Sequence, residues 1–258
     1  MRRSVDLQKD VALITGASSG LGKRFAGVLA AAGAVVVLAA RRVDRLMELK
    51  RKIACDGGRA HVVALDVTQI ESVKEAIEEA ESTAGPIDIL VNNSGVTLTK
   101  NLIDVTPEEY DLVLKTNTKG AFFVATEVAK RMIARFEASP QRNGRIINIS
   151  SVGGLRVVRG IGVYCTSKAA LLHLTKSMAL EWGRYNINVN AVCPGYIRTE
   201  INDAFFDTAA GQKQIQTLPR KRLGDPSDLD GILLLLASGE ARLINGSSIT
   251  VDDGYAVS

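Results

Sequence analysis

The sequence predicts an α/β fold: a single domain built on a doubly wound parallel sheet of about seven strands, with helices on both faces. Short apolar runs alternate with helical segments along all 258 residues, which is the pattern of repeated βαβ units. The runs lack polar alternation, as expected for strands that are buried on both faces. No Pro- or Ser-rich linker and no break in composition divides the chain. We therefore expect residues 1–258 to form one domain.

The first half of the chain contains four predicted strands. The first strand runs directly into a glycine-rich turn and a helix, and Gly33 marks the end of that helix. Strands and helices then continue to alternate up to residue 91. The strands are expected at 11–14, 34–39, 60–65 and 87–91, and the helices at 20–32, 44–54 and 70–83.

The second half repeats this scheme with longer helices. Thr106, Pro107 and Glu109 form a predicted N-cap, N1 proline and capping-box acid. They begin a helical stretch that runs to about residue 136, with an expected interruption near Asn117 and Gly120. Further strands are expected at 145–149, 187–192 and 249–251, and further helices at 164–182 and 225–236.

Composition excludes several classes of function. The chain has 32 Lys and Arg against 28 Asp and Glu, a net charge of +4, which is too small a margin to indicate nucleic-acid binding. The longest apolar run, 28–40, contains Gly33 and is shorter than the roughly 20 residues that span a bilayer. Three cysteines without a C-x-x-C pair and two distant histidines form no metal-ligand spacing. We expect a cytoplasmic protein with no metal, no membrane contact and no nucleic-acid partner.

The first strand is followed by a glycine-rich turn that favours a phosphate-bearing ligand. The turn reads TGASSGLG from Thr15 to Gly22. Glycines allow close backbone approach to a phosphate, and the following helix start supplies free N–H groups. The spacing differs from the usual G-x-G-x-x-G, so a plain strand–helix turn is the alternative. The expected ligand contacts are Gly16, Ser18, Ser19, Gly20, Leu21 and Gly22.

Two arginines after the second strand bear on the choice of dinucleotide. An acid at this position would bind the ribose 2′-hydroxyl of NAD, yet no carboxylate occurs before Asp44. Arg41 and Arg42 stand there instead, and a guanidinium suits a 2′-phosphate. The alternative is a solvated helix start, where arginine is unfavourable for the helix dipole. The sequence favours NADP(H), with NAD(H) still possible.

Ser151, Tyr164 and Lys168 form the predicted catalytic constellation. Tyr164 and Lys168 are four residues apart on a predicted helix and so project from one face. A neighbouring ammonium stabilises a phenolate and lowers the pKa of a tyrosine from its ordinary value near 10. Ser151 follows the fifth strand, where ligands gather in an open α/β sheet. Its hydroxyl can donate to a carbonyl oxygen as negative charge develops there.

These motifs together resemble the short-chain dehydrogenase/reductase family, in the group that includes bacterial 3-oxoacyl reductases. The resemblance covers about residues 9 to 254 and implies a Rossmann-type fold. It rests on TGASSGLG, Asp66-Val67, NNSG at 92–95, Asn117, Ser151, YCTSK at 164–168 and Pro194-Gly195.

The resemblance implies a catalytic tetrad. Tyr164 would donate the proton in reduction and act as the base in oxidation. Lys168 would lower the tyrosine pKa and bind the nicotinamide ribose, and Ser151 would hold the substrate oxygen. Asn117 would keep a water in place in a proton relay through Lys168.

The resemblance also implies further cofactor contacts. Asp66 would accept from the adenine amino group, with Val67 beside the ring, and Asn93 and Gly95 would line the adenosine ribose. The contacts near the nicotinamide would be Pro194, Gly195, Ile197 and Thr199, together with Tyr164 and Lys168.

Two positions depart from the family pattern. Ser19 stands where many NADP-preferring members carry Arg or Lys, so Arg41 would carry the cofactor preference largely alone. Asp253 replaces a glycine that is frequent near the C-terminus of the family.

The substrate region is less defined. The resemblance implies a mobile lid at about 199–218, which holds Ile201, Phe205, Phe206 and Ile215. These residues indicate a substrate with a carbon chain or ring, or else simply pack the lid down. Arg156 and Arg159 lie between Ser151 and Tyr164 and would either meet an anionic substrate tail or be solvated.

We therefore predict an oxidoreductase that transfers a hydride between NADPH and a ketone or secondary alcohol, with a 3-oxoacyl thioester as one candidate. An NAD-dependent secondary-alcohol dehydrogenase is the near alternative. A non-catalytic nucleotide-binding regulator is the alternative from another class. The resemblance also implies a homotetramer.

Overall fold

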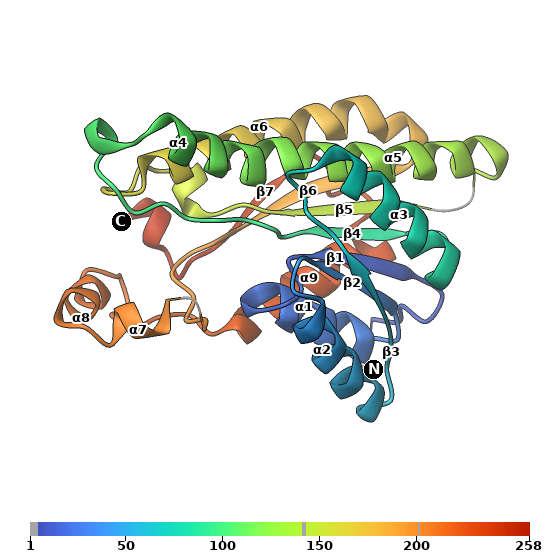
Figure 1. Cartoon of the computed structure of the whole chain (residues 1–258), viewed down its shortest axis with the longest axis horizontal. Helices are drawn as coiled ribbons and strands as arrows, with labels where there is room; N and C mark the ends of the chain where they lie inside the picture. The colour runs from blue at the N-terminus through green and yellow to red at the C-terminus, as the bar shows by residue number, and fades with distance from the viewer. Residues whose placement is uncertain (1–4, 141–142, 201) are drawn as a thin grey trace.

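Over residues 5–140, 143–200 and 202–258, which the computed structural model describes, seven strands form one sheet in the order β3-β2-β1-β4-β5-β6-β7 (Figure 1). All neighbouring pairs are parallel. The sheet is the predicted doubly wound arrangement, since the strand order reverses between β1 and β4. The strands are β1 Val11–Thr15, β2 Val35–Ala40, β3 Arg59–Ala64, β4 Ile89–Asn92, β5 Gly144–Ile149, β6 Ile187–Pro194 and β7 Ser248–Val251.

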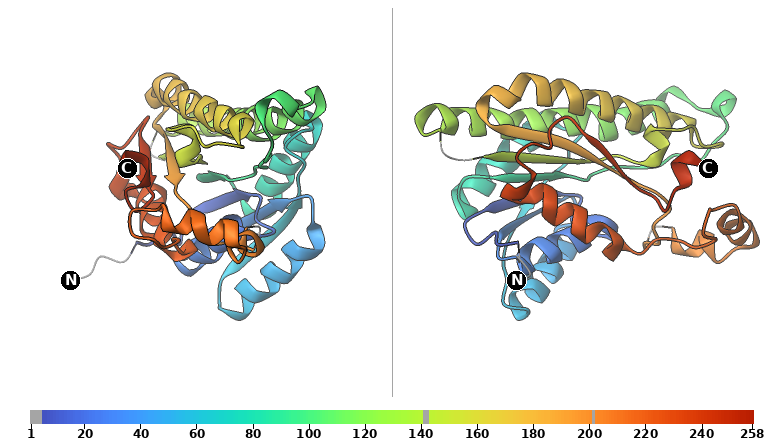
Figure 2. Two further views of the ribbon diagram at one scale, coloured as in Figure 1. Left: turned by 90° about the vertical axis from the view of Figure 1, so that its left-hand side faces the viewer. Right: turned by 180° about the vertical axis from the view of Figure 1, so that it is seen from behind.

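Helices cover both faces of the sheet (Figures 1 and 2). One face packs against α1 Gly20–Ala31, α2 Val43–Cys55 and α9 Asp230–Ala237, with Phe25, Leu46 and Leu233 buried there. The other face packs against α3 Ile70–Ala84, α5 Ala121–Ala138 and α6 Gly162–Trp182. These two apolar layers leave the ends of the strands as the places where polar groups gather.

The predicted elements are confirmed, with shifts at their ends. The fourth strand begins at Ile89 rather than residue 87, and the sixth extends to Pro194. The helix expected at 225–236 begins as a separate 3₁₀ turn, Pro226–Leu229, before α9. Asp225 caps this turn in a capping box with Asp228. The cap and the tight 3₁₀ turn give hydrogen-bond acceptors to backbone N–H groups at the start of the helical stretch.

The long helix of the second half is interrupted where the sequence predicts. Thr106 and Glu109 form the expected capping box at the start of α4, Pro107–Leu114. A π-helical segment, Lys115–Gly120, then separates α4 from α5. This segment contains Asn117 and ends at Gly120, so the predicted interruption is a wide helical turn inside a continuous helical stretch.

The predicted lid consists of two short helices apart from the sheet. They are α7, Asp203–Phe206, and α8, Ala209–Gln216, and they lie at the end of the molecule where the C-terminus is found (Figures 1 and 2). Ile201, one of the apolar residues expected in the lid, lies outside the described residues. None of the helices in the described ranges is both long enough and apolar enough to cross a membrane.

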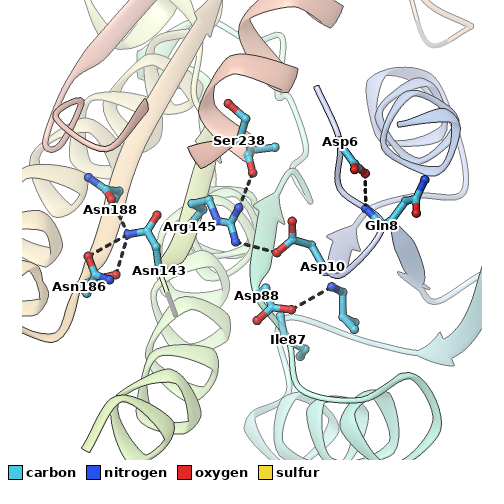
Figure 3. Close-up of polar contacts among 12 residues, drawn as sticks. Asp6, Gln8, Asp10, Ile87, Asp88, Asn143, Arg145, Asn186, Asn188 and Ser238 are labelled. Atoms are coloured by element: carbon cyan, nitrogen blue, oxygen red, sulfur yellow. Dashed lines mark hydrogen bonds and ion pairs between the residues drawn. The ribbon is translucent and has the colours of Figure 1, made fainter. Parts of the chain in front are cut away.

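A polar network joins the amino ends of the strands (Figure 3). Arg145 at the start of β5 donates from Nη2 to Asp10 Oδ1 and from Nη1 to the carbonyl of Ala237, each at 2.8 Å. The Asp88 carboxylate accepts from the backbone N–H of Val11 at 3.0 Å. One mostly buried guanidinium thus links β5, the segment before β1 and the end of α9, far along the chain from one another.

Replacing Arg145 by Met tests this link. The carbonyl of Ala237 and an oxygen of Asp10 each lose a donor, and a mostly buried ion pair is broken. We expect the free energy of unfolding to fall by about 2 kcal/mol, measured by urea denaturation. Lys130→Met is the control, since it breaks an exposed pair with Glu127 and should change little. An equal loss in both variants would contradict the role given to Arg145.

Candidate active site

A pocket of about 880 Å³ opens at the carboxyl ends of the strands and brings most of the predicted site residues together. Two of the predicted residues, Gly22 and Asn117, do not line it. The predicted residues that do line it are Gly16, Ser18, Ser19, Gly20, Leu21, Arg41, Arg42, Asp66, Val67, Asn93, Gly95, Ser151, Tyr164, Lys168, Pro194, Gly195, Ile197 and Thr199.

The pocket lies where the chain leaves β1 and β4 in opposite directions. Thr15, the last residue of β1, accepts through its hydroxyl from the N–H groups of Asn93 at 2.9 Å and Ser94 at 3.0 Å. Asn93 donates its side-chain amide back to the carbonyl of Thr15 at 3.0 Å. The two strand ends are therefore tied together. The side-chain amide of Asn93, expected beside a ribose, serves this scaffold while the residue also lines the pocket.

The glycine-rich turn has the backbone shape that its sequence indicates. Gly16 and Gly20 have φ values of +67° and +54°, a region that side chains disfavour. A Cβ on Gly22 would lie 2.3 Å from the carbonyl oxygen of Gly16, so Gly22 lets α1 pack against the turn. No side chain caps the start of α1, which leaves N–H groups of its first turn available to an anion.

Arg42 contacts the glycine-rich turn directly. It donates from Nη2 to the hydroxyls of both Ser18 and Ser19 at 2.9 Å. Arg41 lines the same part of the pocket. From the sequence, Arg41 is expected to carry the cofactor preference largely alone, because Ser19 replaces a basic residue; in the structure the guanidinium of Arg42 also lies against Ser19. No sequence signal connects residues 24 positions apart in this way.

Asp66 is held with one oxygen free for a ligand. Its Oδ1 accepts from the N–H of Thr68 at 3.0 Å and from the hydroxyl of Thr68 at 2.8 Å. Oδ2 accepts no hydrogen bond in the described part of the chain. Val67 packs against Gly120, where a Cβ would lie 2.7 Å from the Val67 carbonyl oxygen. The Asp66–Val67 segment is thus fixed by the π-helical turn.

These features fit an extended dinucleotide. The uncapped start of α1 suits a diphosphate. The arginines beside it suit a further phosphate, and the free oxygen of Asp66 suits an amino group. The three features lie in one continuous pocket, which is the arrangement that such an extended ligand requires.

Ser151, Tyr164 and Lys168 meet in the same pocket. The side chains of Ser151 and Tyr164 are hydrogen-bonded to each other, and the Ser151 hydroxyl also accepts from the N–H of Gly153 at 3.0 Å. Lys168 Nζ lies 5.7 Å from the centre of the Tyr164 ring. It donates to the carbonyl of Ile149, the last residue of β5, at 2.8 Å.

Burial dominates the acid–base properties of this group. It lowers the pKa of Lys168 to about 8, because the charged ammonium is disfavoured away from water. Burial raises the pKa of Tyr164 above its ordinary value, and the hydrogen bond with Ser151 only partly offsets this. The direction for Tyr164 is opposite to the one expected from the sequence. The protein groups by themselves keep the phenol protonated, as a proton donor requires.

Asn117 has a structural task that the sequence did not indicate. Its side chain is fully buried. Oδ1 accepts from the N–H of Val96 at 2.8 Å, and Nδ2 donates to the carbonyl of Val96 at 2.8 Å and to the hydroxyl of Ser167 at 3.0 Å. Asn117 thus joins the segment after β4 to the helix that carries Tyr164 and Lys168. Its predicted role of positioning a water stays a prediction.

Several lining residues were missed. Tyr196 directly follows Pro194-Gly195, so its position beside the motif was the available signal. Its ring packs edge-on against Phe206 at 6.1 Å and Tyr255 at 5.2 Å between ring centroids. Other lining residues outside the predicted set include Val96, Thr97, Thr99, Leu112, Val158, Arg159, Ile161 and Gln214.

The lid and the C-terminal segment meet at this end of the pocket. Phe206 is buried and Phe205 is half exposed, and both line the pocket. Phe206 therefore packs the predicted lid against Tyr196, and contact of these rings with a substrate stays a prediction. Asp253, the departure from the family glycine, accepts from Nε of Arg220 at 3.1 Å and of Arg222 at 3.0 Å. It holds the segment that follows the lid.

Comparison with known proteins places this geometry in a family. A family model described as enoyl-(acyl carrier protein) reductase matches residues 16–256. Gluconate 5-dehydrogenase of Gluconobacter oxydans (strain 621H) is 35% identical over 248 residues, 96% of this chain and 94% of that protein. The 3-oxoacyl-(acyl-carrier-protein) reductase of Thermotoga maritima is 35% identical over 251 residues, 97% of this chain and 99% of that protein. The chain belongs to the short-chain dehydrogenase/reductase family.

A solved structure agrees with this assignment. The crystal structure of a gluconate 5-dehydrogenase from Burkholderia cenocepacia J2315, in complex with NADP and tartrate, has a TM-score of 0.92 and 36% identity. The match covers 99% of this chain and 98% of that one. This short-chain dehydrogenase/reductase is accordingly an oxidoreductase that acts on CH–OH or C=O groups.

The lowered pKa of Lys168 predicts how the rate of reduction depends on pH. Its ammonium is present below pH about 8 and is lost as the pH rises through that value. We expect the rate of carbonyl reduction to fall above pH about 8, measured as kcat/KM over pH 6 to 10 with NADPH binding followed in parallel. Lys168→Arg keeps its charge over this range. If the fall stayed at the same pH in that variant, another group would be responsible.

Proposed function

We propose that the protein is an NADP(H)-dependent reductase that converts a ketone to a secondary alcohol. The observation that carries the proposal is the group formed by Ser151, Tyr164 and Lys168 in the pocket that fits the dinucleotide. Arg41 and Arg42 support NADP(H) over NAD(H), because their guanidinium groups line the pocket and no acid stands in their place.

The residues divide the reaction between them. A bound NADPH supplies the hydride. Ser151 donates a hydrogen bond to the substrate oxygen, and the phenol of Tyr164 gives that oxygen its proton as the alcohol forms. Lys168 stabilises the phenolate that results. Asn117 holds the helix that carries both groups through its bonds to Val96 and Ser167.

The substrate is a ketone within reach of Tyr164. A 3-oxoacyl thioester is one candidate, supported by the Thermotoga relative, and an oxo sugar acid is the other, supported by the Gluconobacter relative. An assay of both classes by NADPH consumption separates them.

The homotetramer and the cytoplasmic location expected from the sequence also stay predictions.

Tyr164→Phe tests the mechanism. The variant keeps the ring and removes the proton donor, so reduction should fall about 10²- to 10⁴-fold, measured by NADPH consumption. The dissociation constant for NADPH should change less than about threefold. Tyr185→Phe is the control, because Tyr185 packs against Phe136 outside the pocket. A fully active Tyr164→Phe protein would refute the mechanism, and a wild-type protein that binds NADPH but reduces no carbonyl would support the regulator alternative.

Arg41→Ala and Arg42→Ala test the cofactor. Each removes a cation beside the expected 2′-phosphate and should weaken NADPH binding about 10- to 100-fold, the range of one charge-assisted hydrogen bond. NADH binding should be nearly unchanged, as measured by fluorescence titration. Arg45→Ala, exposed on α2 outside the pocket, is the matched control. Tighter binding of NADH than NADPH by the wild-type protein would favour the NAD-dependent alternative.

A further inference from the structure

The charges that line the pocket are unevenly distributed. Arg41, Arg42 and Asp66 belong to the end that fits the dinucleotide, and Lys168 is buried against the carbonyl of Ile149. Among the described residues, Arg159 is the remaining charged side chain that lines the pocket. Asp66 is the one carboxylate in the described lining, so the part of the pocket around Arg159 contains no acid. The substrate end is therefore positive.

Arg159 is exposed, and within residues 5–140, 143–200 and 202–258 its side chain has no hydrogen bond, ion pair or ring contact. Arg156, three residues earlier, differs in each respect. Its guanidinium stacks over the ring of Tyr255 at 4.5 Å and donates to the carbonyls of Tyr255 and Ser258. Arg156 thus anchors the C-terminal segment, whereas the charge of Arg159 is left for a ligand.

The neighbouring charges are satisfied by one another. The N–H of Lys100 donates to the carbonyl of Gly160 at 2.7 Å, next to Arg159. The ammonium of Lys100 pairs with both oxygens of Glu109, at 2.9 and 2.8 Å. Glu109 also accepts from the N–H of Thr106 at 2.9 Å. The carboxylate of Glu109 is therefore occupied within its own pair.

The loop around Arg159 is fixed relative to the catalytic groups. It joins Ser151 to Tyr164, and the bond from Lys100 holds it at Gly160, whose φ of +82° permits the tight turn. Val158 and Ile161 on either side also line the pocket. Apolar neighbours lower the local dielectric constant and strengthen an ion pair formed beside them.

We propose that Arg159 binds an anionic group of the substrate, so that the carbonyl substrate of this enzyme is itself an anion. The oxyanion lies away from the reacting carbon. It is either the carboxylate of an oxo acid or a phosphate of a thioester carrier. A guanidinium recognises both through two parallel N–H bonds. The proposal rests on the proposed function and deepens it by naming the substrate class.

Two matched substrate pairs test this in the full-length protein with saturating NADPH. The first pair is 5-dehydro-D-gluconate and L-sorbose, in which a neutral hydroxymethyl group replaces the carboxylate. The second is acetoacetyl-CoA and ethyl acetoacetate, in which a neutral ester replaces the phosphate-bearing carrier. Arg159→Gln should raise KM about 10- to 100-fold for an anionic substrate with little change in kcat. KM for the neutral partner should change less than about threefold.

Two further variants and the salt dependence complete the design. Arg159→Lys should restore part of the affinity, since it keeps the charge without the fork. Arg51→Gln, on exposed α2, is the control and should change neither pair. Added salt should raise KM for the anion in the wild-type protein, because the ion pair is screened. An effect confined to 5-dehydro-D-gluconate assigns a carboxylate, and one confined to acetoacetyl-CoA assigns a phosphate.

The outcomes separate the two proposals. Equal changes in KM for anionic and neutral partners, or unchanged KM for both anions in Arg159→Gln, would overturn the role of Arg159 while the reductase remains. A wild-type protein that reduces neutral ketones and ignores both anions would do the same. Absence of NADPH-dependent reduction of all four compounds, with NADPH binding intact, would overturn the proposed function, and the role of Arg159 with it.

Discussion

The hydrogen bonds between Thr15 and the start of the segment after β4 are the contacts on which the site depends. The strand order reverses between β1 and β4, so their chain exits diverge and open a crevice. Thr15 and Asn93 fix the width of that crevice by satisfying each other's polar groups. The glycine-rich turn begins on one side of it, and the segment that Asn117 holds begins on the other. The same pair of strand ends therefore positions both halves of the pocket.

Burial and charge oppose each other at the catalytic group. Tyr164 and Lys168 both lie where water is scarce, so each side chain favours its neutral form. The carbonyl of Ile149 accepts from the Lys168 ammonium at 2.8 Å, which gives the cation a partner at the end of β5. Ser151 follows two residues after Ile149, the last residue of the same strand. One strand end thus supplies the acceptor that positions the cation and the hydroxyl that contacts Tyr164.

Most of the fold and much of the site could be predicted from local sequence patterns. Unalternated apolar runs, the Thr106 capping box and the turn glycines depend on neighbouring residues, and each was predicted. Contacts between distant residues were beyond sequence reasoning: Arg42 reaches Ser18 and Ser19 across two strand ends. The side chain of Asn117 faces the scaffold rather than the pocket. The direction of the Tyr164 pKa depends on the depth of burial, which a motif does not encode.

The π-helical segment between α4 and α5 has a consequence for how the chain can change length. A π-turn holds one residue more than an α-turn, so deleting one residue at 115–120 would close the wide turn into a regular α-helix and move the remaining residues of the turn around the helix axis. Asn117 and Thr118, which contact Ser167 and its carbonyl, would then face elsewhere. The number of residues in this stretch therefore matters to the site in the same way as the side chain of Asn117, because both bring these contacts together.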